Sequence, residues 1–122
     1  MNWSAIAAVL LALAVGLGAF GAHGLKARLD AYHLDIYKTA VLYHFLHALG
    51  MLIVAMLPKT GALSPEPANA VCWLLAAGIL IFSGSLYLLA VTGVSVLGAI
   101  TPFGGVAFIV ASLLLAWKLA RR

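Results

Sequence analysis

At 122 residues the chain is long enough for one domain, because domains usually contain about 100–200 residues. Hydrophobic residues make up 66% of it and charged residues 8%, whereas soluble globular domains are roughly 45–50% apolar and about 25% charged. So few charges cannot cover a surface that faces water, which excludes a soluble fold. The sequence therefore predicts a single integral membrane domain over residues 1–122.

The net charge of +4 arises from seven Lys and Arg residues against three Asp and Glu residues. The basic residues stand in short segments beside apolar runs, which is typical of membrane spans and not of a nucleic-acid interface. We therefore expect membrane lipids as partners and no nucleic acid. The single cysteine, Cys72, excludes an internal disulfide and multi-cysteine metal sites. It follows an apolar run beside Trp73, so we expect it to pack in the core.

The first apolar run covers residues 3–22, and about 20 apolar residues in a helix are enough to cross the hydrocarbon core of a bilayer. The run is longer than the roughly 7–15 apolar residues of a signal peptide, and no Lys or Arg precedes it. We interpret it as a membrane span.

The connector at residues 24–38 has an amphipathic pattern. Its apolar residues recur at helical spacing, on one face, while charged residues occupy the other faces; the apolar ones are Leu25, Leu29, Tyr32 and Ile36. The pattern predicts a short interfacial helix that lies flat on the bilayer surface.

The second span is predicted at residues 39–57, between Lys38 and the Pro58-Lys59 pair. Residues 68–117 contain no charged residue, and one straight helix of that length would measure about 75 Å, far more than the bilayer. This stretch must therefore form two spans, at residues 68–91 and 97–119, with a turn at 92–95.

The start of the last span has two interpretations. Threonine at the N-cap and proline at the first helical position favour a start at Thr101-Pro102. Alternatively the helix begins near Val96 and Pro102 bends it. Either way, the predicted fold class is all-α, an antiparallel bundle of four membrane helices with an interfacial helix between spans one and two.

With four spans, both termini and the connector at residues 58–67 lie on one side of the membrane. That side has four basic residues and the other side has three, and positive residues accumulate in the cytoplasm. The count favours cytoplasmic termini; the two sets are Lys59, Lys118, Arg121 and Arg122 on one side, and Lys26, Arg28 and Lys38 on the other.

Residues 16–21 match the glycine pattern of dinucleotide-binding loops, but they lie inside a membrane helix, where that loop cannot form. Small residues there have another use. Ala14, Gly18 and Ala22 recur every four residues, which predicts close packing against a neighbouring helix.

Histidines are the most informative polar residues. His44 and His47 share a face of the second span, Tyr43 is beside them, and His23 ends the first span. Antiparallel helices would bring these side chains together near one membrane interface. Polar residues in a span face the bundle interior and indicate candidate sites.

Four interpretations of this cluster remain open. The side chains can form a hydrogen-bond network between helices, or line a pocket for a small molecule, lipid headgroup or quinone. They can also ligate a metal or haem, since imidazole binds zinc, copper and iron, or relay protons.

Further hydroxyl groups interrupt the later spans. Ser83 and Tyr87 share a helix face, Ser85 lies between them, and Thr101 stands at the start of the last helix. Each is a candidate ligand contact, with helix packing or capping as the alternative.

Four segments resemble the signatures of the YgdD/YwdK family of small, four-span bacterial inner-membrane proteins, which contain a domain of unknown function. The segments are residues 18–24 (GAFGAHG), 43–49 (YHFLHAL), 82–87 (FSGSLY) and 101–105 (TPFGG), and they occur in the family's order and with similar spacing, so that the resemblance extends over nearly the whole chain. The resemblance implies a bacterial inner-membrane location and indicates which positions to test: His23, Tyr43, His47, Ser83, Ser85, Tyr87, Thr101 and Pro102. Family members often have glutamine where His44 stands, which argues against His44 as a metal or haem ligand.

The spans contain no Ser-His-Asp arrangement, no acidic pair and no phosphate loop, so we expect no enzymatic activity. The leading hypothesis is non-enzymatic binding of a small molecule, lipid or ion at the histidine and tyrosine cluster. One alternative is a scaffold or accessory subunit that associates through its helices, as a homo-oligomer or with another membrane protein. The other is a redox protein that binds haem or a metal.

Overall fold

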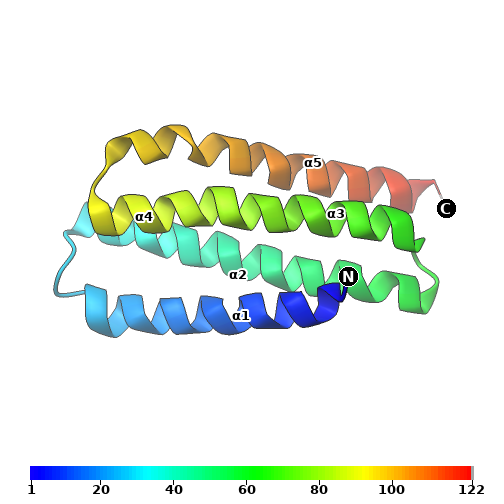
Figure 1. Cartoon of the computed structure of the whole chain (residues 1–122), viewed down its shortest axis with the longest axis horizontal. Helices are drawn as coiled ribbons and strands as arrows, with labels where there is room; N and C mark the ends of the chain where they lie inside the picture. The colour runs from blue at the N-terminus through cyan, green and yellow to red at the C-terminus, as the bar shows by residue number, and fades with distance from the viewer. Residues whose placement is uncertain (122) are drawn as a thin grey trace.

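A computed structural model describes residues 1–121, and Arg122, one of the basic residues counted above, lies outside them. The described residues form helices and no strand. Four helical spans are long and apolar enough to cross a membrane: Trp3–Leu25, Ala31–Thr60, Pro65–Thr92 and Ser95–Ala120. Successive spans run in opposite directions, and the N-terminus lies at the same end of the molecule as the end of the last helix (Figure 1). The predicted all-α membrane fold is confirmed.

The first span consists of α1 (Trp3–Phe20) and a π-helical turn, η1 (Gly21–Leu25). The side chain of Asn2 caps α1 by accepting a hydrogen bond of 3.1 Å from the backbone N–H of Ala5. The helix continues three residues past the predicted end, so His23 is still inside it.

The predicted interfacial helix at residues 24–38 is wrong as a separate element. A short turn follows η1, and α2 (Ala31–Thr60) then runs without interruption through the rest of the connector and the whole second span. The reason is that most of the apolar face packs on the bundle, since Leu25, Leu29 and Ile36 pack in its core whereas Tyr32 is exposed. Tyr37 is buried against Leu25, and its hydroxyl donates to the carbonyl oxygen of Leu17 in α1.

The third span is one rod of three elements, α3 (Pro65–Gly78), the π-helical turn η2 (Ile79–Ser83) and α4 (Gly84–Thr92). Gly93 ends it with a left-handed conformation, φ 72°, which glycine adopts without the steric cost of a Cβ atom.

The connector after Gly93 contains a 3₁₀ turn, η3 (Ser95–Ala99), and α5 (Thr101–Ala120) follows. The α-helix therefore begins at Thr101, as the first interpretation has it. Thr101 itself does not cap the helix, because its hydroxyl is 2.6 Å from the Ser85 hydroxyl of α4.

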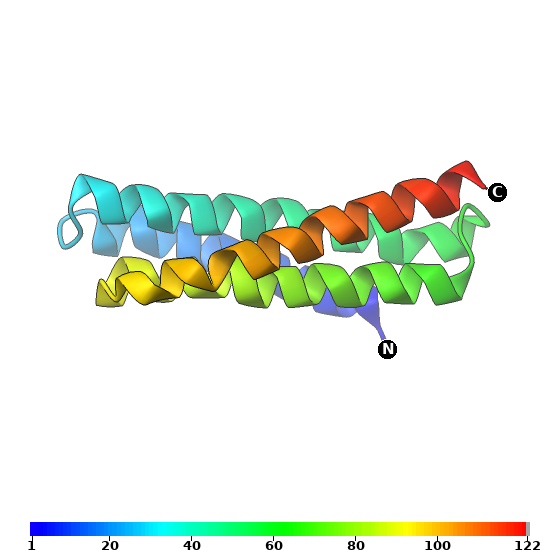
Figure 2. The same ribbon diagram turned by 90° about the horizontal axis from the view of Figure 1, so that it is seen from above.

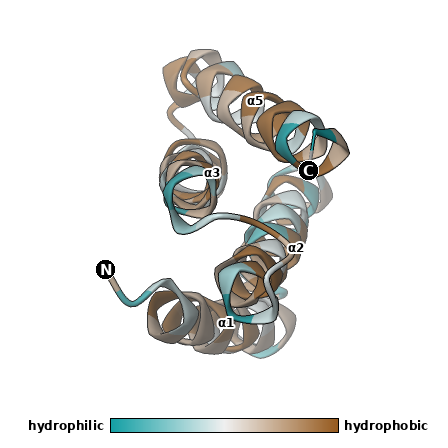
Figure 3. Cartoon of the chain, turned by 90° about the vertical axis from the view of Figure 1, so that its right-hand side faces the viewer, coloured by the Kyte–Doolittle hydropathy of each residue, from teal (hydrophilic) through white to brown (hydrophobic). Residues whose placement is uncertain are grey.

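The helices pack in the order in which they occur in the chain. α1 packs on α2, α2 also packs on α3, η2 and α4, and α5 packs on α3 and η2. Figure 2 shows the crossing of the helices from above, and the end-on view of Figure 3 places α1 and α5 on the outer sides, with α2 and α3 between them. α2 is the element that joins the two halves of the bundle.

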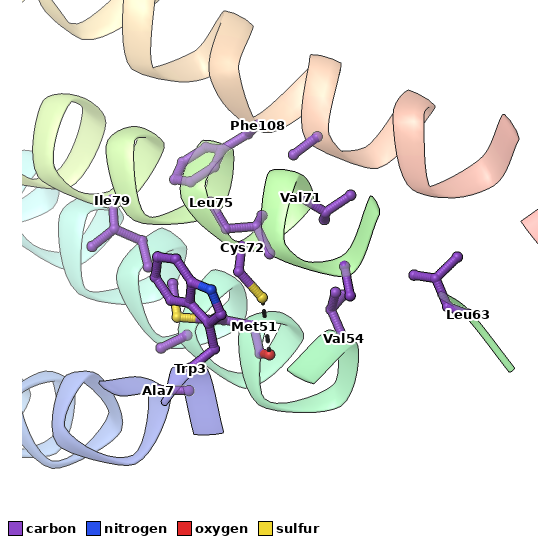
Figure 4. Packing of buried hydrophobic residues seen from close by; sticks show 13 residues of the cluster. Trp3, Ala7, Met51, Val54, Leu63, Val71, Cys72, Leu75, Ile79 and Phe108 are labelled. Atoms are coloured by element: carbon purple, nitrogen blue, oxygen red, sulfur yellow. Dashed lines mark hydrogen bonds between the residues drawn. The ribbon is translucent and has the colours of Figure 1, made fainter. Parts of the chain in front are cut away.

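The main core lies between α2, α3 and α5, around Met51, Val71 and Cys72, which are almost fully buried (Figure 4). Burial of Cys72 agrees with its expected packing role. Near the N-terminus, the Trp3 Nε1–H donates a hydrogen bond of 2.7 Å to Asn69 Oδ1 and so ties α1 to α3.

Small residues set the distance between α1 and α2, although not in the predicted pattern. Ala14 is buried, and a Cβ at Gly18 would lie 3.3 Å from Val41 of α2, but Ala22 is exposed. The buried small residues are Ala7, Ala14 and Gly21, at intervals of seven, as in left-handed helix packing. A Cβ at Gly21 would meet the Tyr37 ring of α2, so this position packs within the chain.

Gly104 of α5 is the closest approach between two backbones in the second half of the bundle. A Cβ there would lie 2.7 Å from the Cα of Phe82 in η2, whereas a Cβ at the next residue, Gly105, would meet nothing nearer than 3.8 Å. The contact at Gly104 is with backbone, so it cannot be relieved by a side-chain rotation.

We predict that Gly104→Ala forces α5 away from η2 and lowers the free energy of unfolding by about 1–3 kcal/mol, the usual cost of overpacking. Gly105→Ala is the matched control, and it should leave stability unchanged or slightly raised because alanine favours helix. Unfolding in mixed micelles with a denaturing detergent measures both. Equal stability of the two variants would contradict this account of the α5–η2 contact.

The cap of α2 predicts a pH dependence. The Asp30 carboxylate accepts hydrogen bonds of 2.8 Å from the His33 backbone N–H and from His33 Nδ1, and these bonds lower the pKa of Asp30 from its ordinary value of 3.8. Because folding lowers the pKa, the ionised Asp30 carboxylate stabilises the fold fully above pH 3.8. This stabilisation is lost as the pH falls through the lower pKa of the folded state.

We therefore expect Asp30→Ala to lower the melting temperature at pH 7 and the difference from wild type to shrink below pH 4, as followed by thermal unfolding in detergent. Asp35→Ala is the control, because no hydrogen bond of its carboxylate occurs within residues 1–121. A difference that stays constant down to pH 2 would show that the cap is not the cause.

Candidate functional site

The structure divides the predicted site residues into separate groups along and around α2. At 1.5 Å per residue, α2 is about 45 Å long, and His44 and His47 stand about 20 and 24 Å from its first residue. They lie near the middle of the helix, because α2 begins eight residues before the predicted span.

His23 is not part of the cluster. It lies in η1 at the end of the first span, is exposed, and makes no side-chain hydrogen bond with any residue of the described chain. α1 and α2 are joined by a short turn, so His23 lies beside the start of α2, far along the axis from His44. The prediction that His23 and His44 lie at similar depth is wrong.

His44 forms a buried polar pair with Tyr87 of α4. Only 3% of its side chain is exposed, and its Nδ1 is 2.8 Å from the Tyr87 hydroxyl oxygen. The other ring nitrogen is buried without a hydrogen bond of normal geometry to residues 1–121, and the ring interacts with the Leu10 backbone of α1. His44 therefore contacts three spans at once, which fits the expected network between helices.

Tyr43 and His47 pack against η2 and α5, whereas His44 pairs with Tyr87 of α4. The His47 ring stacks on Phe108 with centroids 3.5 Å apart and an angle of 9°, and Tyr43 lies 4.6 Å from the Phe82 ring of η2. Tyr43 also stacks on His47 at 5.8 Å. We call these four residues the aromatic cluster.

The hydrogen bond of His47 determines the state of its ring. Nδ1 lies 2.8 Å from the carbonyl oxygen of Tyr43, which can only accept, so Nδ1 donates. Nε2 of a neutral ring is then an acceptor, and among residues 1–121 it has no donor.

Two open apolar hollows share His47; one is lined by α2, η2 and α5, and the other by α2, α3 and α5. One, of about 450 Å³, is lined by the aromatic cluster with Gly105, Ile109, Ser112 and Leu113. The other, of about 250 Å³, is lined by His47, Gly50, Ile53, Val54, Val71, Leu75, Ala111, Ser112 and Leu115. His47 and Ser112 line both, so the two hollows form one groove, which we call the α2–α5 groove.

The remaining predicted residues make structural contacts. Ser83 is fully buried and donates a hydrogen bond of 2.8 Å to the Ala40 carbonyl oxygen of α2. Ser85 bonds Thr101, which links α4 to the start of α5. Neither serine lines the α2–α5 groove.

The described residues do not bring together the donors of a metal-ion site. Within residues 1–121 no three His, Cys, Asp or Glu side chains lie close enough to hold an ion. His44 and His47 also make different contacts, one with Tyr87 and the other with Phe108.

Phe82, Phe108 and Ser112 line the groove but were not predicted from the sequence. Aromatic residues are common in membrane helices, and only the packing of the helices shows that Phe108 stacks on His47 and that Phe82 lies against Tyr43. The i, i+4 spacing of Phe108 and Ser112 was the available signal, because it places both on one face of the last span.

We predict that Tyr87→Phe lowers the free energy of unfolding in mixed micelles by about 0.6–2 kcal/mol, the range for hydrogen bonds between membrane helices. It leaves His44 Nδ1 buried without a partner. Tyr32→Phe, at a side chain that is 69% exposed, is the control and should behave as wild type. If the two variants were equally stable, the His44–Tyr87 bond would contribute nothing to the fold.

Comparison with known proteins places the chain among membrane proteins. A family model described as "Protein of unknown function (DUF423)" matches residues 17–105. UPF0382 membrane protein YwdK of Bacillus subtilis is 52% identical over 107 residues, 86% of this chain and 85% of that protein.

Similar UPF0382 membrane proteins occur in Staphylococcus saprophyticus and Staphylococcus epidermidis. Each is 48% identical over 103 residues, which is 84% of this chain and 83% or 82% of the relative, respectively. No solved structure matches the chain. The resemblance found in the sequence motifs is confirmed, and the chain belongs to the DUF423 family, the UPF0382 membrane proteins.

Proposed function

We propose that the protein binds, without catalysing a reaction, an apolar molecule that carries a hydroxyl group and enters the α2–α5 groove from the bilayer. The observation behind the proposal is the Nε2 of His47, an acceptor without a donor in the middle of a membrane span. Ionisable residues at that depth are costly and indicate functional sites by default.

The chemistry of the ligand follows from the acceptor. Lipid tails provide no hydrogen-bond donor, so His47 Nε2 stays unpaired in hydrocarbon, at a cost of roughly 1–3 kcal/mol. The nearby hydroxyl of Ser112 does not relieve this cost, because it donates to the Phe108 carbonyl oxygen at 2.9 Å. A ligand hydroxyl would donate to Nε2, and this favours an alcohol or phenol over a molecule with acceptors alone.

The shape of the groove supports a ligand with a long apolar body. The two hollows lie end to end along α2 and α5 and are lined almost wholly by apolar and aromatic side chains. Phe108 stacks on His47 and Nδ1 is held by the Tyr43 carbonyl, so the imidazole is fixed before a ligand arrives. Such preorganisation lowers the entropic cost of binding.

For the orientation, we infer cytoplasmic termini in the bacterial inner membrane. The structure has both termini and Lys59 at one end, together with Lys118 and Arg121, and the sequence adds Arg122. This end has slightly more positive residues than the other end. Because positive residues accumulate on the cytoplasmic side of a membrane, the excess favours cytoplasmic termini.

The test compares 4-decylphenol with its methyl ether, 4-decylanisole, which has nearly the same shape but no donor. We expect the phenol to raise the melting temperature of the detergent-solubilised wild type by several degrees, because ligands that bind only the folded state stabilise it. The ether should have little effect.

His47→Phe keeps a ring to stack on Phe108 but removes Nε2, so the phenol should no longer raise its melting temperature. His23→Phe is the control and should respond as wild type does. A phenol response that survives in His47→Phe, or an equal response to the ether, would overturn the proposal.

A further inference from the structure

Another hollow, of about 470 Å³, lies at the end of the molecule that holds the N-terminus, about one helical turn beyond the α2–α5 groove, because Leu115 of α5 lines the groove and Lys118 lines this hollow. It is formed by the turn between α2 and α3, the first turn of α3 and the end of α5. Its lining residues are Gly61, Ala62, Leu63, Ser64, Glu66, Pro67, Lys118 and Arg121.

Two cations line this hollow. Lys118 Nζ lies 4.7 Å and the Arg121 guanidinium carbon 5.0 Å from the centre of the Trp117 ring, so one indole holds both side chains. Within residues 1–121 neither cation forms an ion pair; the pair found there, His33–Asp30, is at the other end of the bundle. Glu66 is the only acidic residue of the lining, and it bonds neither cation.

The turn also offers backbone donors. The N–H groups of Leu63, Ser64 and Glu66 make no hydrogen bond with residues 1–121, because α3 begins at Pro65 and its first N–H groups have no carbonyl partner in the helix. The positive end of the α3 dipole lies at the same place. The hollow is therefore lined by two cations without an ion pair and by residues with three N–H groups that have no hydrogen bond within residues 1–121, and this set attracts an anion.

We propose that this hollow binds the phosphate group of an anionic phospholipid. The position favours a lipid over free phosphate, since the hollow lies where two apolar spans end, and Trp117 is a residue type that concentrates at the lipid headgroup level. Basic hollows between membrane helices on that level bind lipid headgroups. The phosphate would lie between Lys118 and Arg121, with the acyl chains along the apolar surface of α5.

Native mass spectrometry of the detergent-solubilised full chain tests this inference with three probes. They are palmitoyl-oleoyl phosphatidylglycerol, the zwitterionic palmitoyl-oleoyl phosphatidylcholine, and inorganic phosphate. We expect one phosphatidylglycerol to be retained at concentrations at which phosphatidylcholine is not. Retention of phosphate without phosphatidylglycerol, or equal retention of the two lipids, would overturn the proposal.

The double variant Lys118→Gln, Arg121→Gln should lose phosphatidylglycerol binding by about tenfold. Lys26→Gln, Arg28→Gln makes the same charge change at the opposite end and should bind as wild type does. Equal loss in both variants would mean non-specific attraction and would contradict a defined site. Melting temperatures without lipid establish that each variant is folded.

Glu66→Gln provides a test in the other direction, because it removes the only negative charge of the lining. It should raise phosphatidylglycerol retention about threefold or more. A decrease, in a variant that melts as wild type does, would count against the assignment of the phosphate to this hollow.

Discussion

The fold depends on one constraint, which is that polar groups inside the bilayer must find their hydrogen-bond partners within the chain. The buried hydroxyl of Ser83 donates to the Ala40 carbonyl oxygen at 2.8 Å, and Tyr87 pairs with His44 at the same distance. Tyr37 reaches the Leu17 carbonyl oxygen in the same way. Each of these bonds begins or ends on α2, and this accounts for its position between the two halves of the bundle. The Nε2 atoms of His44 and His47 both depart from the rule among residues 1–121, but only His47 lines the α2–α5 groove, and for that reason the proposed ligand site is placed there.

Close backbone contact is the second requirement, because lipid tails solvate apolar side chains as well as a protein does and give no net hydrophobic drive to helix association. The chain meets it at Gly21, which leaves room for the Tyr37 ring, and at Gly104, which lies against the Phe82 backbone. Both contacts involve a π-helical turn, since Gly21 begins η1 and Phe82 is in η2. A π-helical turn inserts one residue into a helix and so changes the direction of the helix face. Such turns can therefore place the contacts of Gly21 and Gly104 against the neighbouring helix.

The sequence predicted the number of spans and their order, because charges, prolines and apolar run length act locally. It left two starts open for the last helix, and the structure has the α-helix begin at Thr101. It did not predict that residues 31–38 extend α2, since an amphipathic segment fits a bilayer surface and a protein surface equally well, and only the burial of Tyr37 distinguishes them. The same limit applies to the site. The pattern identified His44 and His47 as polar groups in a span, but their partners, Tyr87 and Phe108, come from helices far along the chain, and their pairing depends on how the helices pack.

The order of packing has a consequence for biosynthesis. Because α2 packs on α1, the third span packs on α2, and α5 packs on the third span, each helix meets a surface already present when it enters the membrane. No helix has to displace an earlier contact, and most contacts join neighbouring segments, a topology that favours rapid folding. The α2–α5 groove is the exception, because its second wall is synthesised after the other three spans, and the groove exists only once α5 has entered the membrane.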